Sequence, residues 1–295
     1  MKAQLNYSNN FLDMLRDGVF VLNVDVTKEW HQYVLDILRI FGIEKYVENI
    51  RVVIGEKNAI DFDYDNPPNA TIELVEGPDI LMLGNLLHEL GHYRLHVDGI
   101  IGSYVEVFLR GEVDERTKRK IKTHSLRLLL TLGEFINERM IVERLNDMPH
   151  YLRDSYEFLM ETSILDLANR GAGWFAEYAR GRGFFFLAVS SLILEEVYKK
   201  YFTSANDRHT ISNIEKAMAY IENGCRLANL HKKYLIVKHH ISSMMRQLPS
   251  IESLTSKHVE EILKSLLEML LREAIIEEVS HIEYGKYMVL LSTNC

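Results

Sequence analysis

The N-terminal part of the chain shows a helix-like hydrophobic pattern followed by strand-like ones. Apolar positions recur at helical spacing over residues 28–41, and Gly42 ends that segment. Three short runs that favour β-strands follow, at residues 50–54, 60–64 and 71–75. The middle run alternates apolar and acidic residues, which is typical of a half-exposed strand. The pattern therefore predicts one helix and then a small three-stranded sheet.

From Gly77 onward the pattern favours helices. Gly77 and Pro78 mark a helix start, because proline suits the first helical turn, and an apolar run follows them. Beyond Gly99 we expect helices almost to the end of the chain. A long helix is expected from Asp114 to Leu145, where Asn146 to Pro149 stops it. Later helices should be interrupted at residues 170–173, 181–183, 204–207 and 248–256.

These elements predict an α+β fold that is mostly α-helical. Residues 1–150 are expected to form a core of one helix, the three-stranded sheet and two further helices. Residues 151–295 are expected to form a large all-helical region that recognises a substrate, caps the core or mediates oligomerisation. We find no internal repeat and no low-complexity linker at the boundary near residue 150.

Composition and charge exclude several classes of function. The net charge of −8 gives no electrostatic basis for binding nucleic acid, and the basic residues 116–122 are better explained as a solvated helix start. The longest apolar run, residues 184–194, is short of the about 20 residues of a membrane span. With no secretory signal pattern, and only Cys225 and Cys295 as cysteines, we expect a cytoplasmic protein without disulfides.

The candidate chemistry lies in an HExxH sequence, His88-Glu89-Leu90-Gly91-His92, inside the apolar run. Residues four apart on a helix lie about 40° from each other, so His88 and His92 share a face and can provide two ligands of a tetrahedral zinc ion. Glu89 projects beside them, where a carboxylate can take a proton from a metal-bound water and deliver it to the leaving amine. The pattern indicates a zinc metallopeptidase with one zinc ion per chain and Glu89 as its catalytic base.

A catalytic zinc site needs a third protein ligand, with the fourth position left for water. Glu138 is the favoured candidate, because it lies on a downstream helix that is apolar on most sides. Glu134 lies one turn earlier, either as the alternative ligand or as a partner that orients the ligand. Asp98 is the less favoured alternative, because its use requires the helix to end sharply after His92. His96, about 12 Å from His88 along the helix axis, is better explained as a structural residue or as a residue that supports a ligand.

The stretch from His88 to His96, HELGHYRLH, resembles the active-site helix of the ImmA/IrrE family of metallopeptidases. Glu138, followed by an apolar stretch and Met148-Pro149, is similar to that family's ligand helix, although the two residues after the glutamate differ from the usual alanine and asparagine. The resemblance covers about residues 28–150. It implies a zincin-like core whose metal is held by HExxH and a glutamate, and a protein substrate such as a DNA-binding repressor or an antitoxin-like partner.

The expected reaction is hydrolysis of a peptide bond in a substrate that adds as an extra strand to a sheet edge. That edge is expected at residues 60–64 or 71–75. A further hydrogen-bond donor would stabilise the transition state, and the candidates are His124, His150, Tyr151 and Arg139. His239 and His240 are adjacent, so on a helix they point apart and are expected to be structural or exposed.

Two alternatives belong to other classes of function. In the first, the zincin-like core is a regulatory or binding protein without proteolytic activity that acts through its helical C-terminal half. That alternative predicts that function survives the substitution Glu89→Gln. In the second, the chain is a helical interaction module and its HExxH binds no metal. The order of strands and helix, the apolar surroundings of the motif and the paired glutamates argue against the second alternative.

Overall fold

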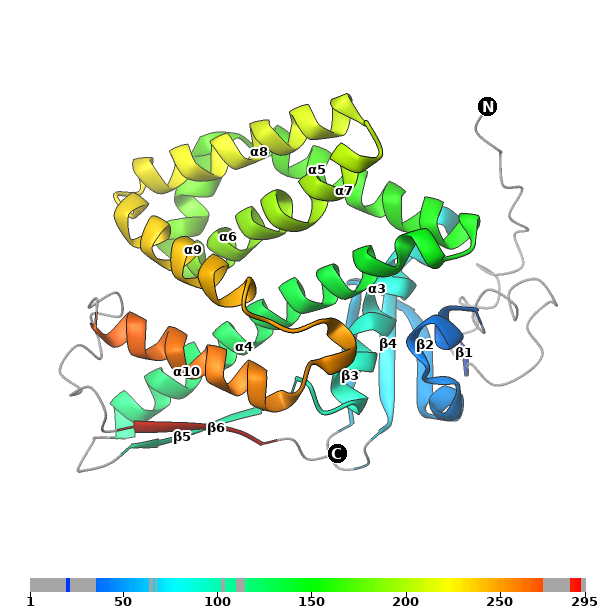
Figure 1. Ribbon diagram of the computed structural model, residues 1–295, viewed down its shortest axis with the longest axis horizontal. Helices are drawn as coiled ribbons and strands as arrows, with labels where there is room; N and C mark the ends of the chain where they lie inside the picture. Colours follow the sequence, from blue (N-terminus) through cyan, green and yellow to red (C-terminus); the bar gives the residue numbers. More distant parts are fainter. Residues whose placement is uncertain are drawn as a thin grey trace. The chain divides into compact units, whose positions relative to one another are not determined.

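Figure 1 shows the helices and strands of the protein in a computed structural model. It describes residues 20–21, 36–63, 66, 68–101, 104–109, 115–272 and 287–292. These residues divide into two compact units. The first draws on Met1–Val97 and Glu143–Met160, and the second draws on Asp98–Val142 and Glu161–Asn294. Each unit thus combines two stretches of the chain, and the single domain boundary near residue 150 stays a prediction.

The first unit contains a small mixed sheet with strand order β1-β2-β4-β3. β2 (Ile50–Gly55) runs parallel to β4 (Ala70–Val75), and β3 (Ala59–Phe62) runs antiparallel along the other side of β4. The two-residue strand β1 (Phe20–Val21) lies beside β2. The three strands predicted from the sequence are therefore confirmed.

The strand order decides which strand has an edge open to pairing. β4 is hydrogen-bonded on both sides, so the expectation that residues 71–75 offer an exposed edge is wrong. β4 lies inside the sheet because it pairs with β2 on one side and with β3 on the other. Among the described residues, β3 is the strand that forms the other edge.

Helix α3 (Asp79–Val97) carries the HExxH residues and packs against β4 and β3 (Figure 1). The Pro78 carbonyl accepts hydrogen bonds from the N–H groups of Leu81 and Met82, which confirms the helix start predicted at Gly77 and Pro78. Apolar side chains of this helix and of the sheet are buried together as the core of the unit. They include Ile50, Val52, Ala70, Ile72, Leu74, Leu83, Leu86, Leu87 and Leu90. This shared core fixes α3 against the sheet.

The predicted helix over residues 28–41 lies partly within the described residues, where residues 36–41 are helical. Gly42 ends it with φ +62, a conformation that favours glycine. Arg94 of α3 donates hydrogen bonds to the carbonyl oxygens of Phe41 and Gly42. This contact ties α3 to the end of the preceding helix.

Helix α5 (His150–Tyr178) begins in the first unit and crosses α3 at very short range. A Cβ atom added to Gly84 of α3 would lie 2.7 Å from the Ser155 carbonyl oxygen and 3.0 Å from the Leu159 Cβ. Side chains do not tolerate a backbone atom at 2.7 Å, so any residue larger than glycine would force the helices apart. Gly84 is therefore a requirement of this packing.

The second unit is mostly helical and contains most of α4 (Glu115–Arg144). The 3-10 helix η2 (Leu145–Asp147) follows α4, which confirms the expected end. The other helical segments are η3 (Ala179–Gly183), α6 (Phe184–Leu192), η4 (Ile193–Tyr198), α7 (Lys199–Ser204), α8 (Arg208–Leu227), α9 (His231–Met245), η5 (Ile251–Ser253) and α10 (Ser256–Arg272). Gly171 interrupts α5 with φ +75, at one of the predicted breaks. No described helix is long and apolar enough to cross a membrane.

A pair of strands departs from the expectation of helices beyond Gly99. β5 (Tyr104–Leu109) and β6 (Tyr287–Ser292) form an antiparallel two-stranded sheet, so the prediction of an all-helical region over 151–295 is wrong at its C-terminal end (Figure 1). The two segments are far apart in the sequence. Each is a short apolar run, and periodicity alone cannot distinguish such a run from part of a helix. Which strand it pairs with is decided by the tertiary structure.

The contact at Gly84 can be tested by adding one methyl group. We expect Gly84→Ala to lower the free energy of unfolding by about 1–3 kcal/mol, as overpacking of a tight contact usually does. Gly173→Ala is the matched control, because a Cβ atom added there meets nothing within 4 Å and alanine favours a helix. Urea unfolding followed by circular dichroism measures both variants. Wild-type stability in Gly84→Ala would contradict the close approach of α3 and α5.

Candidate metal centre

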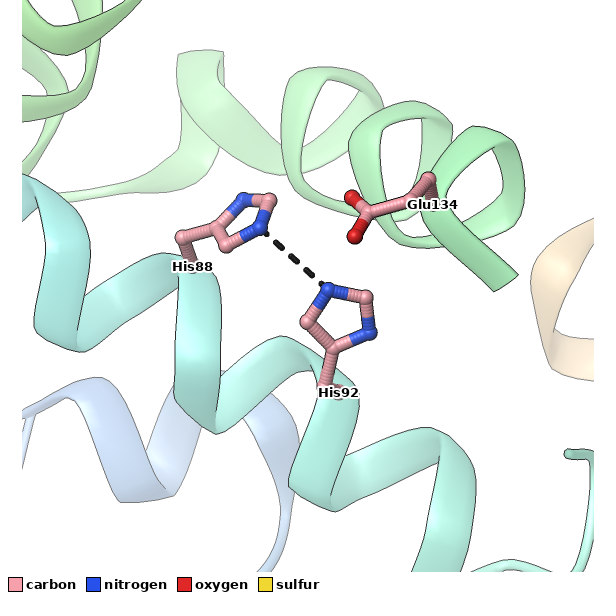
Figure 2. Close-up of side chains that lie close together, drawn as sticks. All are labelled: His88, His92 and Glu134. Carbon is pink, nitrogen blue, oxygen red and sulfur yellow. Dashed lines mark hydrogen bonds between the residues drawn. The ribbon is translucent and has the colours of Figure 1, made fainter. Parts of the chain in front are cut away.

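Helix α3 brings the imidazoles of His88 and His92 together, as the spacing of the two residues predicts (Figure 2). Their ring centroids are 4.9 Å apart, and their Nε2 atoms are 3.2 Å apart. Two nitrogen ligands at about 2.0–2.1 Å from a tetrahedral zinc ion would be separated by roughly 3.3 Å. The two histidines therefore already have the spacing that a shared zinc ion requires.

A carboxylate completes a group that could hold a metal ion. Among the described residues, His88, His92 and Glu134 offer ligand atoms that all lie within 4.8 Å of one another. Figure 2 shows the Glu134 carboxylate, on α4, directed toward the two imidazoles. All three side chains are half-buried. Two histidines and one glutamate are a donor set that zinc accepts, with a fourth position left for water.

Glu138, which the sequence favoured as third ligand, lies one turn later on α4 and is not a member of this group. Its side chain is buried, and its charge contributes to the raised pKa of Tyr198, the last residue of η4. The local geometry therefore favours Glu134, the alternative ligand. The choice between the two glutamates stays a prediction.

Tyr198 is a residue that sequence analysis did not identify. Burial raises the pKa of its hydroxyl well above the ordinary value, and the negative charges of Glu138 and Glu134 raise it further. The hydroxyl therefore keeps its proton at neutral pH and acts as a hydrogen-bond donor. Its sequence surroundings, residues 195–200, mix charged and apolar residues far from the HExxH residues and contain no signal that would relate it to them.

Glu89, the predicted catalytic base, lies beside His88 on α3 and is only 6% exposed. A buried carboxylate is unfavourable unless hydrogen-bond donors or a cation stabilise it. A divalent cation held by the neighbouring histidines would provide such stabilisation. The burial of Glu89 thus fits the proton-transfer role predicted for it.

Tyr156, on α5, is a second residue that the sequence did not identify. It is fully buried, and its hydroxyl lies 3.4 Å from Nδ1 of His88. Metal-binding histidines usually donate their other ring N–H to a partner, which sets the tautomer and the ring orientation. Because Nε2 of His88 faces His92, Nδ1 is the nitrogen left for Tyr156. The packing of α5 on α3 creates this contact, and no local pattern predicts it.

Two other polar residues near the motif, Asp98 and His96, are not members of the group that could hold a metal ion. α3 runs without interruption to Val97, so the sharp helix end needed for Asp98 as a ligand is absent, and Asp98 is exposed. His96 is buried and stacks on Phe62, with ring centroids 3.9 Å apart. Burial lowers the pKa of His96 and so favours its neutral form. The structural role predicted for His96 is confirmed.

The four candidate donors for the transition state differ in their surroundings. The Tyr151 hydroxyl donates to the carboxylate of Asp36. His150 is exposed, Arg139 is half-buried, and the side chain of His124 lies outside the described residues. The assignment of a transition-state donor therefore stays a prediction.

The remaining histidines and basic residues singled out in the sequence behave as expected. His239 is exposed, whereas His240 is half-buried with its Nε2 3.1 Å from the Ser265 hydroxyl, so the two rings do not act together. Arg116 and Arg119, from the basic start of α4, are exposed. These residues add no second candidate site.

Comparisons with models of protein families, with curated proteins and with solved structures found no match. The resemblance to the ImmA/IrrE family therefore stays a prediction from the sequence. The imidazole spacing and the donor set are independent of that similarity, because they follow from the coordinates of α3 and α4.

The third ligand can be identified by zinc affinity, measured by competition with a chromophoric chelator. We expect one zinc ion per wild-type chain. Glu134→Ala should weaken binding by more than about a hundredfold, whereas Glu138→Ala should weaken it by about a hundredfold at most, as loss of an outer partner does. Asp98→Ala is the matched carboxylate control and should bind like wild type. A larger loss in Glu138→Ala than in Glu134→Ala would assign the ligand as the sequence does.

The contact between Tyr156 and His88 generates a separate prediction. Tyr156→Phe removes only the hydroxyl, so the fold should persist while zinc affinity falls by about tenfold or more. Tyr93→Phe is the control, because its buried hydroxyl donates instead to the Pro68 carbonyl at 2.9 Å. Equal zinc affinity in Tyr156→Phe and Tyr93→Phe would mean that Tyr156 does not support His88.

Proposed function

We propose that the protein is a zinc-dependent metallo-endopeptidase of the HExxH type, similar to the ImmA/IrrE family. One observation carries the proposal: the Nε2 atoms of His88 and His92 are 3.2 Å apart, and a carboxylate oxygen of Glu134 lies within 4.8 Å of a ring nitrogen of each. The buried carboxylate of Glu89, next to His88, supports a hydrolytic role for this centre rather than a purely structural one.

The residues of the centre have distinct tasks in this mechanism. Bound zinc would polarise the scissile carbonyl and lower the pKa of water toward neutrality. His88 and His92 would hold it through Nε2, and Tyr156, whose hydroxyl lies 3.4 Å from Nδ1 of His88, would keep that ring oriented. Glu89 accepts a proton from the attacking water as the new C–O bond forms, and donates it to the amine nitrogen as the C–N bond breaks. The products are one carboxylate and one amine.

The sheet offers a place for an extended substrate. β3 is an edge strand among the described residues, and α3 packs against it within the same unit. An edge strand presents backbone N–H and C=O groups to which an extended peptide can add as a further strand. A substrate paired with β3 would run beside the helix that carries Glu89. We infer from the family resemblance that this substrate is a cytoplasmic regulatory protein, similar to a repressor or an antitoxin.

The proposal is tested with zinc-loaded protein and a peptide library prepared from a cellular proteome. Mass spectrometry would detect new peptide termini. We expect wild type to produce them and Glu89→Gln to reduce their rate of formation by about a hundredfold to ten-thousandfold, because the general base is removed. Zinc content should not change in Glu89→Gln. Asp98→Asn, an exposed acid on the same stretch, is the control and should cleave at the wild-type rate.

The absence of any Glu89-dependent cleavage by the zinc-loaded protein would contradict the enzymatic proposal. A chain that binds zinc and is equally inactive as wild type and as Glu89→Gln would support the alternative of a regulatory or binding protein that acts through its helical half. A chain that binds no zinc would leave the helical interaction module as the better explanation.

A further inference from the structure

The last part of α5 and the start of α6 expose aromatic side chains that contact one another. Trp174 and Tyr178 are stacked, with ring centroids 5.2 Å apart and an angle of 13° between the ring planes. Phe186, on α6, follows with its ring centroid 5.9 Å from that of Tyr178. The three side chains, here called the aromatic row, are 36% to 45% exposed. Their mutual contacts hold large apolar groups in fixed positions at the surface of the second unit.

A basic side chain extends the aromatic row. The Arg170 guanidinium carbon lies 4.3 Å from the centre of the Trp174 ring, a cation–π contact. Trp, Tyr and Arg are the residues whose truncation most often weakens a protein–protein complex strongly. Side chains that are already held in place lose little conformational entropy when a partner binds. The aromatic row and Arg170 are therefore suited to contact another protein surface.

The charges along the same exposed side of α5 indicate which surface that is. Residues 166–180 contain four charged residues, all exposed and alternating in sign: Asp166, Arg170, Glu177 and Arg180. Read backwards with every sign reversed, this order of charges is the same, with its centre between residues 173 and 174. α5 bends at Gly171, where φ is +75, but the contact of Arg170 with Trp174 shows that the exposed residues on the two sides of the bend adjoin.

Such a pattern is complementary to a second copy of itself. Two copies of α5 that lie antiparallel across a two-fold axis would bring Arg170 opposite Glu177 and Asp166 opposite Arg180. Each pair would occur twice, because in an isologous contact residue i meets residue j and j meets i. Arg170 also pairs with Asp166 of its own chain at 2.6 Å, and Arg180 donates to the Leu227 carbonyl. A guanidinium with five N–H donors can keep these bonds and bind a second acceptor.

The sizes of the side chains fit the same register. A Cβ atom added to Gly173 or to Gly181 would meet nothing within 4 Å, so both glycines leave open space. In the antiparallel arrangement, Trp174 of each copy lies opposite Gly173 of the other. Leu165, which is also exposed, lies opposite Gly181. Two exposed apolar side chains thus face glycines that leave room for them.

We propose that the protein forms a homodimer in which the exposed side of α5 packs antiparallel against the same side of a second copy. Trp174 is the central contact, and the pairs of Arg170 with Glu177 fix the register. An anionic lipid surface fits this side less well, because Asp166 and Glu177 would face it. The dimer goes beyond the proposed peptidase activity, and none of these residues belongs to the group that could hold a metal ion.

Sedimentation equilibrium of the full chain over a range of micromolar concentrations tests for the dimer. We expect wild type to dimerise. Trp174→Ala should raise the dissociation constant of the dimer at least about thirtyfold, as loss of a central aromatic contact does. Leu235→Ala is the matched control, because it removes a similarly exposed apolar side chain from α9 and should dimerise like wild type.

Charge reversal tests the antiparallel register. Glu177→Arg places two arginines opposite each other in each pair, and Arg170→Glu places two glutamates there, so each variant alone should dimerise at least about tenfold more weakly. A mixture of the two variants restores opposite charges, so mixed dimers should form with nearly wild-type affinity. A fluorescent label on one variant detects them. Glu215→Arg, at an exposed acid of α8, is the control for net charge and should dimerise like wild type.

Wild type that stays monomeric at every concentration would overturn the inference, as would Trp174→Ala that dimerises like wild type. Charge variants that associate no better when mixed than alone would overturn it too, because Arg170 and Glu177 would then not be partners. Monomeric wild type that binds anionic phospholipid vesicles, with Trp174→Ala losing that binding, would assign the aromatic row to a lipid surface instead. Circular dichroism verifies folding. If Trp174→Ala does not fold, the charge variants decide.

Discussion

The close approach of α3 and α5 at Gly84 is the contact on which the candidate metal centre depends. Because glycine has no side chain, the Ser155 carbonyl can lie 2.7 Å from the position that a Cβ atom would occupy. Tyr156 follows Ser155 directly, and its hydroxyl reaches Nδ1 of His88. A contact between two helices thus determines the orientation of an imidazole ring and leaves its Nε2 directed at His92.

Charge is the second constraint on the centre. Glu89 and Glu138 are both 6% exposed, and Glu134 is half-buried. Removing carboxylates from water costs several kcal/mol for each ion unless donors or cations stabilise them. A divalent ion at the two histidines would provide the opposite charge beside Glu134.

Elements with a local cause were predicted from the sequence. The strands β2, β3 and β4 are bounded by turn-forming residues, α3 begins at Pro78, and α4 ends in η2, as their sequence patterns indicate. The pair of β5 and β6 was not predicted, because each strand is stabilised by a partner far away in the chain. The same reason explains the error on the exposed edge at residues 71–75, since strand order is a property of the assembled sheet.

By itself, the sequence determined the helix that carries His88, Glu89 and His92 and the shared face of its two histidines, because residues four apart meet on any α-helix. It also favoured, as third ligand, one of two glutamates one turn apart, with Asp98 as the less favoured alternative. The tertiary structure alone decided that Glu134 joins the two histidines in the group that could hold a metal ion, whereas Glu138 is buried outside that group. Both glutamates fit the same helical pattern, and only the packing of other helices around α4 makes their surroundings different.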